Sequence, residues 1–282
     1  MRVSIFGPTG YIASAFRKQT QFECIPIERE SREPLSDDVL YFIGSVDEHS
    51  MLTDVHLDID TNLSILVDVL KVWRARKPNG CFSFIGSWFV YNQSPIPVTE
   101  QAPCSPLGFY SVAKLAAERL IESYCRVYNL PFRILRLANV YGGHDPGASR
   151  KKNALQWLIG KMARNEPIQL YYDGRFMRDY LHIDDAVRAI DVCLSDMPTD
   201  VTVNVGSGKS VEFRRIIEMA RDALGSTSEI TPWPGGAPDF HKTVQAKNFR
   251  MDVRFLRSYG WLPMVPLESG IKKMCWDLSH RV

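Results

Sequence analysis

Residues 2–13 read Arg-Val-Ser-Ile-Phe-Gly-Pro-Thr-Gly-Tyr-Ile-Ala. The first five predict a short apolar strand, and a helical pattern then runs to about residue 20. Gly7 permits a tight turn between them, Gly10 leaves room for a phosphate at the backbone, and Ala13 lets the helix pack closely on the strand. Backbone N–H groups and the helix dipole would both face an anion at this turn.

We therefore predict that the glycine turn binds the pyrophosphate of a dinucleotide; the alternative is a plain β–turn–α connection. The expected contact positions are Gly7, Thr9, Gly10, Tyr11 and Ile12. Residues 24–27 predict a second strand, and Glu28 ends it about 20 residues past the glycines, where a carboxylate would accept from a ribose 2′-OH. Arg29 follows and would instead suit a 2′-phosphate. We predict NAD and leave NADP open.

Strands and helices alternate along the rest of the chain, a pattern typical of a parallel sheet covered by helices. The expected strands are residues 38–46, 81–85, 132–137, 168–172 and 201–205; the expected helices are residues 60–76, 154–164, 186–194, 213–224 and one that begins at Tyr110. Because the link 30–37 is too short for a crossover helix, part of the sheet should be abbreviated.

The predicted fold class is therefore α/β, a Rossmann-type doubly wound parallel sheet with a smaller C-terminal α/β substrate-binding lobe. We assign residues 1–145 to a dinucleotide-binding domain, with about 178–205 returning to it, and residues 146–282 to the second lobe. Ligands of such sheets bind in the crevice at the C-terminal ends of the strands.

Tyr110 and Lys114 lie one turn apart on a predicted helix, so they share one of its faces. A phenol titrates near pH ~10, and a neighbouring ammonium stabilises the phenolate and lowers its pKa. Tyr110 could then exchange a proton with a hydroxyl or a ketone near neutral pH. Ser87, at the end of the strand predicted at 81–85, could hold the same oxygen. The alternative is an ordinary surface helix.

Apolar residues recur at helical spacing in two of the expected helices. From Tyr110 onward they are Val112, Leu115, Ala116, Leu120 and Ile121. In the helix 60–76 we expect Leu63, Leu66, Val67 and Leu70 to face inward.

Composition narrows the classes of partner. The chain has 282 residues, 45% hydrophobic and 23% charged, with a formal net charge of +2, which gives no argument for nucleic acid or membrane. Six cysteines lack C-x-x-C spacing, so we expect buried free thiols and neither disulfides nor a metal site. The start has no signal-peptide layout and no apolar run reaches membrane length, so we predict a reducing, cytoplasmic location.

Arg178 carries a guanidinium fork that suits phosphate oxygens; the alternative is an ion pair with Asp179 or Asp184. We expect His182 to be structural, and Asp184 and Asp185 to cap the helix 186–194. The basic cluster 150–152 would meet a diphosphate or simply be solvated.

Five motifs together make most of the chain resemble the extended short-chain dehydrogenase/reductases, the NAD-dependent epimerase/dehydratase family that includes UDP-galactose 4-epimerase. They are Gly7-x-x-Gly10-x-x-Ala13, Ser87-x-x-Val-Tyr91, Tyr110-x-x-x-Lys114, Arg136-Leu-x-Asn139-Val-Tyr-Gly and Arg178-Asp-Tyr-Leu-His-Ile-Asp-Asp185. The resemblance implies that Tyr110 is the acid/base, that Lys114 lowers its pKa and holds the nicotinamide ribose, and that Ser87 orients the substrate oxygen. It also implies that Asn139 and Arg178 bind the sugar diphosphate.

Asn62 lies where the family keeps an Asn in a helix behind the site; a surface or capping Asn is the alternative. Residues 252–261 resemble the family's terminal helix with its Gly-Trp stop. In the loop 232–238 relatives often carry an Arg that holds the nucleotide, which this chain lacks; His241 or Lys242 could substitute.

The implied function is an NAD(P)-dependent nucleotide-sugar epimerase or 4-ketoreductase that transfers a hydride at a sugar carbon. Dehydratases of the family carry an Asp-Glu pair where this chain has Trp88 and Phe89, so dehydration is disfavoured, and Gly86 replaces the usual second Ser. The alternative is a non-catalytic dinucleotide-binding sensor or scaffold of the same fold, which the presence of Ser87, Tyr110 and Lys114 disfavours. The expected partner is a nucleotide sugar, and we leave a homodimer open.

Overall fold

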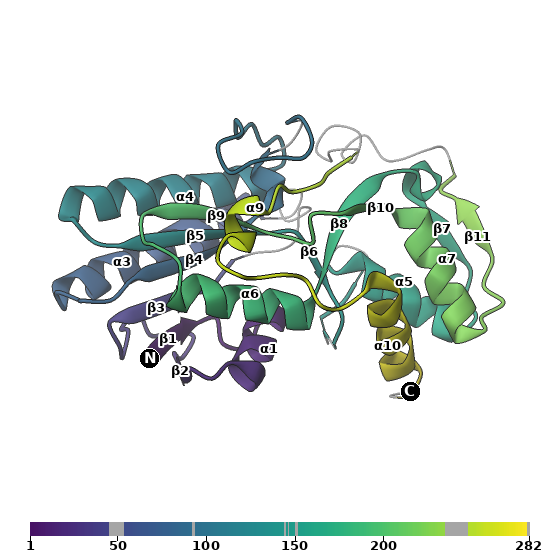
Figure 1. Ribbon diagram of the computed structural model, residues 1–282, viewed down its shortest axis with the longest axis horizontal. Coiled ribbons are helices and arrows are strands. Elements are labelled where there is room, and N and C mark those ends of the chain that lie inside the picture. The colour runs from purple at the N-terminus through teal and green to yellow at the C-terminus, as the bar shows by residue number, and fades with distance from the viewer. Residues whose placement is uncertain are drawn as a thin grey trace.

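The computed structural model describes residues 1–44, 54–91, 94–143, 145, 147–149, 152–234 and 248–280. Its centre is a six-stranded parallel sheet in the order β2-β1-β3-β4-β5-β9 (Figure 1). The strands are β1 (Arg2–Phe6), β2 (Glu23–Pro26), β3 (Asp38–Tyr41), β4 (Phe82–Ser87), β5 (Phe132–Leu137) and β9 (Val201–Val205). The predicted α/β class with a doubly wound parallel sheet is confirmed.

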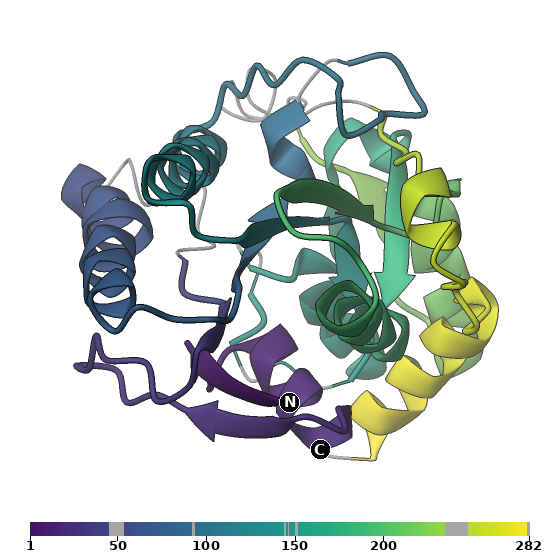
Figure 2. The same cartoon turned by 60° about the vertical axis from the view of Figure 1, so that its left-hand side comes forward.

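Helices cover both faces of this sheet (Figure 2). On one face lie α1 (Tyr11–Gln19) and α6 (Ile183–Ser195), and on the other α3 (Ile65–Ala75) and α4 (Phe109–Tyr128). Each face has its own apolar cluster, one including Phe16 and Ile190, the other including Trp73 and Ile121. With helices on both faces, every residue of β4 and β5 is buried, including the polar Ser83 and Ser87 and the charged Arg133 and Arg136.

The order of strands reverses between β1 and β3. The chain passes from β1 outward to β2 and returns to pair β3 with the opposite edge of β1. As predicted, residues 27–37 cross back without a helix. Open α/β sheets bind ligands in the crevice at such a reversal, beyond the C-terminal ends of the strands.

A second group of elements lies beyond those ends. It contains a three-stranded sheet in the order β10-β8-β6, a parallel pair β11-β7, and helices that share an apolar cluster. The elements are β6 (Asn139–Tyr141), α5 (Ala154–Ala163), β7 (Ile168–Leu170), β8 (Met177–His182), β10 (Ser210–Glu212), α7 (Phe213–Leu224), β11 (Ile230–Pro232) and α10 (Leu267–Ser279). β9 returns to the central sheet; the domain boundary at residue 145 stays a prediction.

Several predicted bounds were wrong. The strand predicted at 24–27 is β2, which ends two residues before Glu28, and the strand predicted at 38–46 ends at Tyr41. The strand predicted at 168–172 gives way after Leu170 to a 3₁₀ turn (Tyr171–Gly174). Residues 252–261 contain only the short α9 (Arg254–Arg257), and α10 was not predicted. Short apolar runs do not fix where pairing stops, because the neighbouring strand decides it.

The inward face predicted for the helix 60–76 was also partly wrong, and the apolar spacing noted from Tyr110 onward does not mark the buried face of α4. In α4, Val112 and Leu120 are exposed, whereas Lys114, Ala117 and Glu118 are buried. In α3, Val67 is exposed, and the buried set is Leu66, Val69, Leu70 and Trp73. A prediction that assigns only apolar residues to the buried face of a helix cannot identify a buried face that contains a lysine and a glutamate.

The helix predicted at 60–76 begins earlier, with α2 (Val55–Ile59), followed by a π-helical turn η2 (Asp60–Ser64) that leads into α3. Asn62 lies buried inside this π turn. π-turns inside helices are frequent at functional sites, since the extra residue reorients the side chains beside it.

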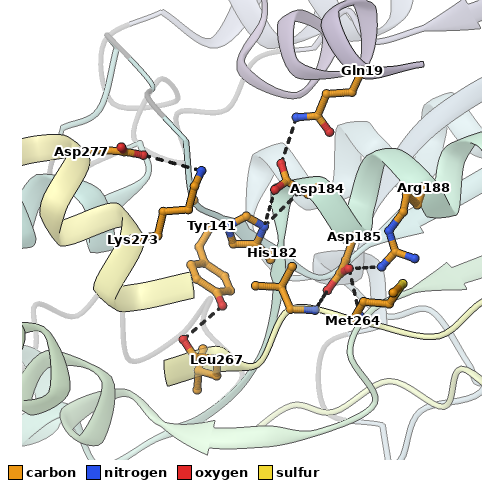
Figure 3. A network of polar contacts seen from close by, with 12 residues as sticks. Gln19, Tyr141, His182, Asp184, Asp185, Arg188, Met264, Leu267, Lys273 and Asp277 are labelled. Carbon is orange, nitrogen blue, oxygen red and sulfur yellow. Dashed lines mark hydrogen bonds and ion pairs between the residues drawn. The ribbon is translucent and has the colours of Figure 1, made fainter. Parts of the chain in front are cut away.

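The start of α6 is capped differently from the prediction. Nδ1 of His182 accepts from the N–H of Asp184 at 3.2 Å, so His182 is the cap and its structural role is confirmed (Figure 3). Asp185 is buried and accepts from the N–H groups of Met264 and Val265, both at 3.0 Å, and it also contacts Arg188. The segment before α10 is thereby fastened to α6.

Within the described residues, no helix has both the length and the apolarity to cross a membrane.

We predict that Asp185→Ala destabilises the fold by about 3 kcal/mol, because two amides and a guanidinium lose a buried charged acceptor. Urea unfolding followed by circular dichroism measures the change. Asp184→Ala is the matched control, since the Asp184 side chain is 42% exposed and should cost less than about 1 kcal/mol. Equal effects of the two substitutions would contradict the anchoring role of Asp185.

Candidate active site

A cavity of about 980 Å³ lies at the C-terminal ends of the central strands, between them and the second group of elements. The sheet side contributes Gly10–Ala13 after β1, Gly44 after β3, residues 85–89 at the end of β4 and residues 137–141 after β5. The other side comes from α5, β7, β8 and the segment 229–233. The cavity therefore lies where the strand order predicts a ligand.

The glycine turn fits a dinucleotide pyrophosphate. Gly7 has a φ of +74°, and a Cβ there would lie 3.1 Å from the backbone N of Ile43, so only glycine suits the turn. The N–H of Gly10 donates to the carbonyl of Gly7 at 3.2 Å, and α1 begins immediately afterwards. A Cβ at Gly10 would meet only the carbonyl of Gly7, at 3.4 Å, so its other side is open for an anion to approach the first N–H groups of α1.

Of the predicted cofactor contacts, the structure places some in the lining of the cavity and others outside it. Gly10, Tyr11 and Ile12 line the cavity, and the Tyr11 hydroxyl donates to the carbonyl of Gly142. Gly7 and Thr9 lie in the turn outside the lining. Glu28 and Arg29 are exposed beyond the end of the edge strand β2 and also lie outside it.

Ser87, Tyr110 and Lys114 all line the cavity. Ser87 is the last residue of β4, while Tyr110 and Lys114 lie in the first turns of α4. Lys114 is only 5% exposed; its Nζ donates to the carbonyl of Ile85 at 3.2 Å and lies 4.8 Å from the centre of the Phe84 ring. Burial lowers the pKa of Lys114 to about 8, although the carboxylate of Glu118 acts in the opposite direction.

Gly44 leaves space beside its backbone for the side chains of Lys114 and Asn62. A Cβ at Gly44 would lie 2.6 Å from Nζ of Lys114 and 3.0 Å from Oδ1 of Asn62. Nδ2 of Asn62 donates to the carbonyl of Asp58 at 2.9 Å, which orients the amide. Both side chains therefore reach the space beside Gly44, and any larger residue at position 44 would displace them.

A buried ion pair explains why residue 86 is a glycine. Arg136 and Glu118 are almost inaccessible and meet at 2.6 Å, with the guanidinium contacting both carboxylate oxygens. A Cβ at Gly86 would lie 2.8 Å from Oε1 of Glu118. The glycine that replaces the family's second Ser therefore gives this carboxylate its place.

Trp88 and Phe89 form an aromatic wall of the cavity. Their rings stack at 4.1 Å, and Trp88 also packs on Phe249 at 4.3 Å in an apolar cluster. Phe89 meets the Tyr110 ring edge-to-face at 6.1 Å. The two residues thus pack on an apolar cluster and also line the cavity.

Arg178 reaches the cavity from β8. Its guanidinium lies 5.2 Å from the centre of the Trp88 ring and 4.7 Å from that of Phe176. The neighbouring carboxylate of Asp179 accepts from the N–H groups of Ser207, Gly208 and Met251. Asn139 also lines the cavity, and its Nδ2 donates to the carbonyl of Asp179 at 3.1 Å.

The sequence did not predict the far end of the cavity, which is lined by residues of the second lobe. Nζ of Lys161 lies 5.3 Å from the centre of the Trp157 ring, and Tyr171 packs on Trp233 at 4.9 Å. The signal available was the stiff Pro-Trp-Pro of residues 232–234. His241 and Lys242, and two of the three basic residues at 150–152, lie outside the described residues; Lys152 lines the cavity and pairs with Asp145 at 3.3 Å.

An open α/β sheet with a glycine turn and a Ser, Tyr and Lys in one crevice defines a dinucleotide-dependent class of enzyme. The model of the "NAD dependent epimerase/dehydratase family" matches residues 36–206. The chain belongs to this family and is accordingly an enzyme that works with NAD or NADP. The recognition drawn from its motifs is confirmed.

Two relatives and one solved structure illustrate the similarity. A putative UDP-glucose 4-epimerase of Methanocaldococcus jannaschii is 25% identical over 84% of this chain and 75% of its own length. A dTDP-glucose 4,6-dehydratase of Neisseria meningitidis serogroup B is 29% identical over 65% of this chain, a match that spans 53% of the dehydratase. The structure of RMD from Pseudomonas aeruginosa complexed with NADPH superposes with a TM-score of 0.85, at 22% identity, covering 100% of this chain and 99% of the other.

We predict that Gly86→Ala lowers the free energy of unfolding by about 2 kcal/mol, because the new methyl group displaces a buried carboxylate from its guanidinium partner. Gly160→Ala in α5 is the matched control: its Cβ would meet only Nη1 of Arg164, at 3.8 Å, and alanine favours a helix. Denaturant titration of both variants decides the point, and a Gly86→Ala protein as stable as the parent would refute the tight contact.

Proposed function

We propose that the protein is a nucleotide-sugar epimerase or 4-ketoreductase that transfers a hydride at a sugar carbon, with Tyr110 as the acid/base. The observation that carries the proposal is that Ser87, Tyr110 and Lys114 line the same cavity as the first turn of α1. A dinucleotide held by that turn and a sugar held opposite would place the reacting carbon beside the Tyr110 hydroxyl.

The three side chains take distinct parts in the proton transfer. Lys114 is protonated at neutral pH even with its lowered pKa, so its charge favours the phenolate of Tyr110, one turn away. Tyr110 then removes a proton from the sugar hydroxyl during oxidation and returns it during reduction. Ser87 holds the same oxygen by a hydrogen bond from the end of β4.

Gly10, Tyr11 and Ile12, with Gly7 and Thr9 in the turn, would hold the pyrophosphate of NAD or NADP, and Lys114 the nicotinamide ribose. The bound nicotinamide supplies and accepts the hydride. Glu28 favours NAD as an acceptor for the ribose 2′-OH, while Arg29 beside it would suit a 2′-phosphate; we propose NAD.

The substrate would enter with its diphosphate toward Arg178 and Asn139. A guanidinium binds two phosphate oxygens at once, and the aromatic rings under Arg178 hold its plane. Trp88 and Phe89 present an apolar wall where a dehydratase would need a proton-donating pair. That wall suits a sugar whose 6-hydroxyl is already lost, so a 4-keto-6-deoxy substrate is proposed.

The function is tested by incubating the protein with NAD(P) or NAD(P)H and a panel of nucleotide-hexoses and their 4-keto-6-deoxy derivatives, followed by mass spectrometry and NMR. We predict inversion at a sugar carbon without net use of cofactor, or reduction of the ketone with stoichiometric use. NAD retained through purification would favour the epimerase. Loss of water at catalytic turnover, or no hydride transfer on any substrate, would overturn the proposal.

We predict that Tyr110→Phe lowers turnover by roughly 100-fold or more, because the ring remains and only the proton-carrying hydroxyl is lost. Cofactor affinity, measured by calorimetry, should change little. Tyr128→Phe is the control, since Tyr128 lies at the other end of α4 and is 44% exposed. Near-parental turnover in the Tyr110 variant would remove Tyr110 from the mechanism.

A further inference from the structure

Glu118 is a buried carboxylate that takes no direct part in the proposed proton transfer. It is 0% exposed and lies on α4, one turn after Lys114 and two turns after Tyr110. Arg136 of β5, only 2% exposed, grips both of its oxygens at 2.6 to 3.2 Å. Burying two charges costs free energy. Stability alone therefore does not explain an ion pair at this place.

The contacts tie Glu118 to the same piece of β4 that Lys114 holds. Nζ of Lys114 donates to the carbonyl of Ile85, and the missing Cβ of Gly86, the next residue, leaves room for Oε1 of Glu118. The two side chains therefore point from one face of α4 onto consecutive residues of one strand. At the i, i+4 spacing, opposite charges on a helix attract each other.

The groups around Lys114 come from its own helix and from the elements that pack beside it. Its own helix presents Glu118 and Tyr110; β4 presents only the Ile85 carbonyl and the Phe84 ring. The turn η2 presents the neutral Asn62, and α2, which also packs on α4, carries the buried Asp58. From β5 comes Arg136, beyond Glu118. Of these, Glu118 is the charged group that raises the pKa of Lys114 against the effect of burial.

Resting on the proposed function, we propose that Glu118 is a positioning residue for the reaction: its carboxylate, fixed by Arg136, keeps the buried Lys114 ammonium charged and seated on β4, one turn from Tyr110. Arg136 keeps Glu118 ionised in a site where burial raises the pKa of its carboxyl group. The two-oxygen contact with Arg136 is the arrangement typical of a carboxylate. A neutral residue of the same shape would leave Lys114 to lose its proton at lower pH.

The test is Glu118→Gln, which keeps the shape and removes the charge. With lysines labelled at Cε with ¹³C, and the Lys114 signal assigned by Lys114→Arg, NMR titration follows Lys114 directly without turnover. We expect its pKa to fall by about one unit from the parental value. The alkaline limb of the kcat/KM profile, where activity is lost as pH rises and Lys114 is deprotonated, should move to lower pH by the same amount.

Two further proteins keep the test decisive. Glu122→Gln removes a carboxylate one turn further along α4 that pairs with the exposed Arg119 at 2.7 Å, and it should leave both readouts unchanged. If Glu118→Gln does not fold because Arg136 is left unpaired, Glu118→Gln/Arg136→Met removes both charges, and the Lys114 pKa should still fall.

An unchanged Lys114 titration in the folded variant would overturn the proposal, as would a fallen pKa with an unmoved alkaline limb. A fallen pKa in a protein that acts on no nucleotide sugar would instead count against the proposed function while leaving the Glu118–Lys114 coupling in place.

Discussion

The close packing of α4 against the ends of β3 and β4 is the constraint on which the site depends. Lys114 and Glu118 both need the space that a side chain would fill, and Gly44 and Gly86 provide it. With that space the helix lies close enough for the Lys114 ammonium to bond the Ile85 carbonyl. Tyr110 and Ser87 then reach the cavity because one is a turn before Lys114 and the other ends the strand.

Buried charge is balanced locally throughout this part of the fold. Glu118 is matched by Arg136, while the carboxylates of Asp179 and Asp185 accept from backbone N–H groups of distant segments. Since an unpaired buried charge costs several kcal/mol, each of these carboxylates specifies which segment lies beside it. The single run of residues 178–185 thereby offers Arg178 to the cavity and anchors the segments after β9 and before α10.

Much of the fold could be predicted because it follows from local pattern. The glycine turn after β1, the apolar strands and most helices were correctly placed, and Ser87, Tyr110, Lys114, Asn139 and Arg178 were all predicted and all line one cavity. What failed was orientation: Val67 was expected inside and is exposed, and the apolar Val112 and Leu120 of α4 are exposed as well. The π turn at Asn62 and the His182 cap were not predicted, because hydrogen bonding and not apolar periodicity determines where they form.

By itself the sequence determined the order of strands and helices, the family and the identity of the chemical groups, because periodicity, glycine positions and motif spacing are properties of the chain alone. Only the tertiary structure decided that Gly86 makes room for Glu118, that Trp88 belongs to the core and the cavity at once, and that Trp157, Tyr171 and Trp233 close the far end. The physical reason is that these features depend on which atoms of distant segments compete for the same space, and sequence spacing carries no information about that competition.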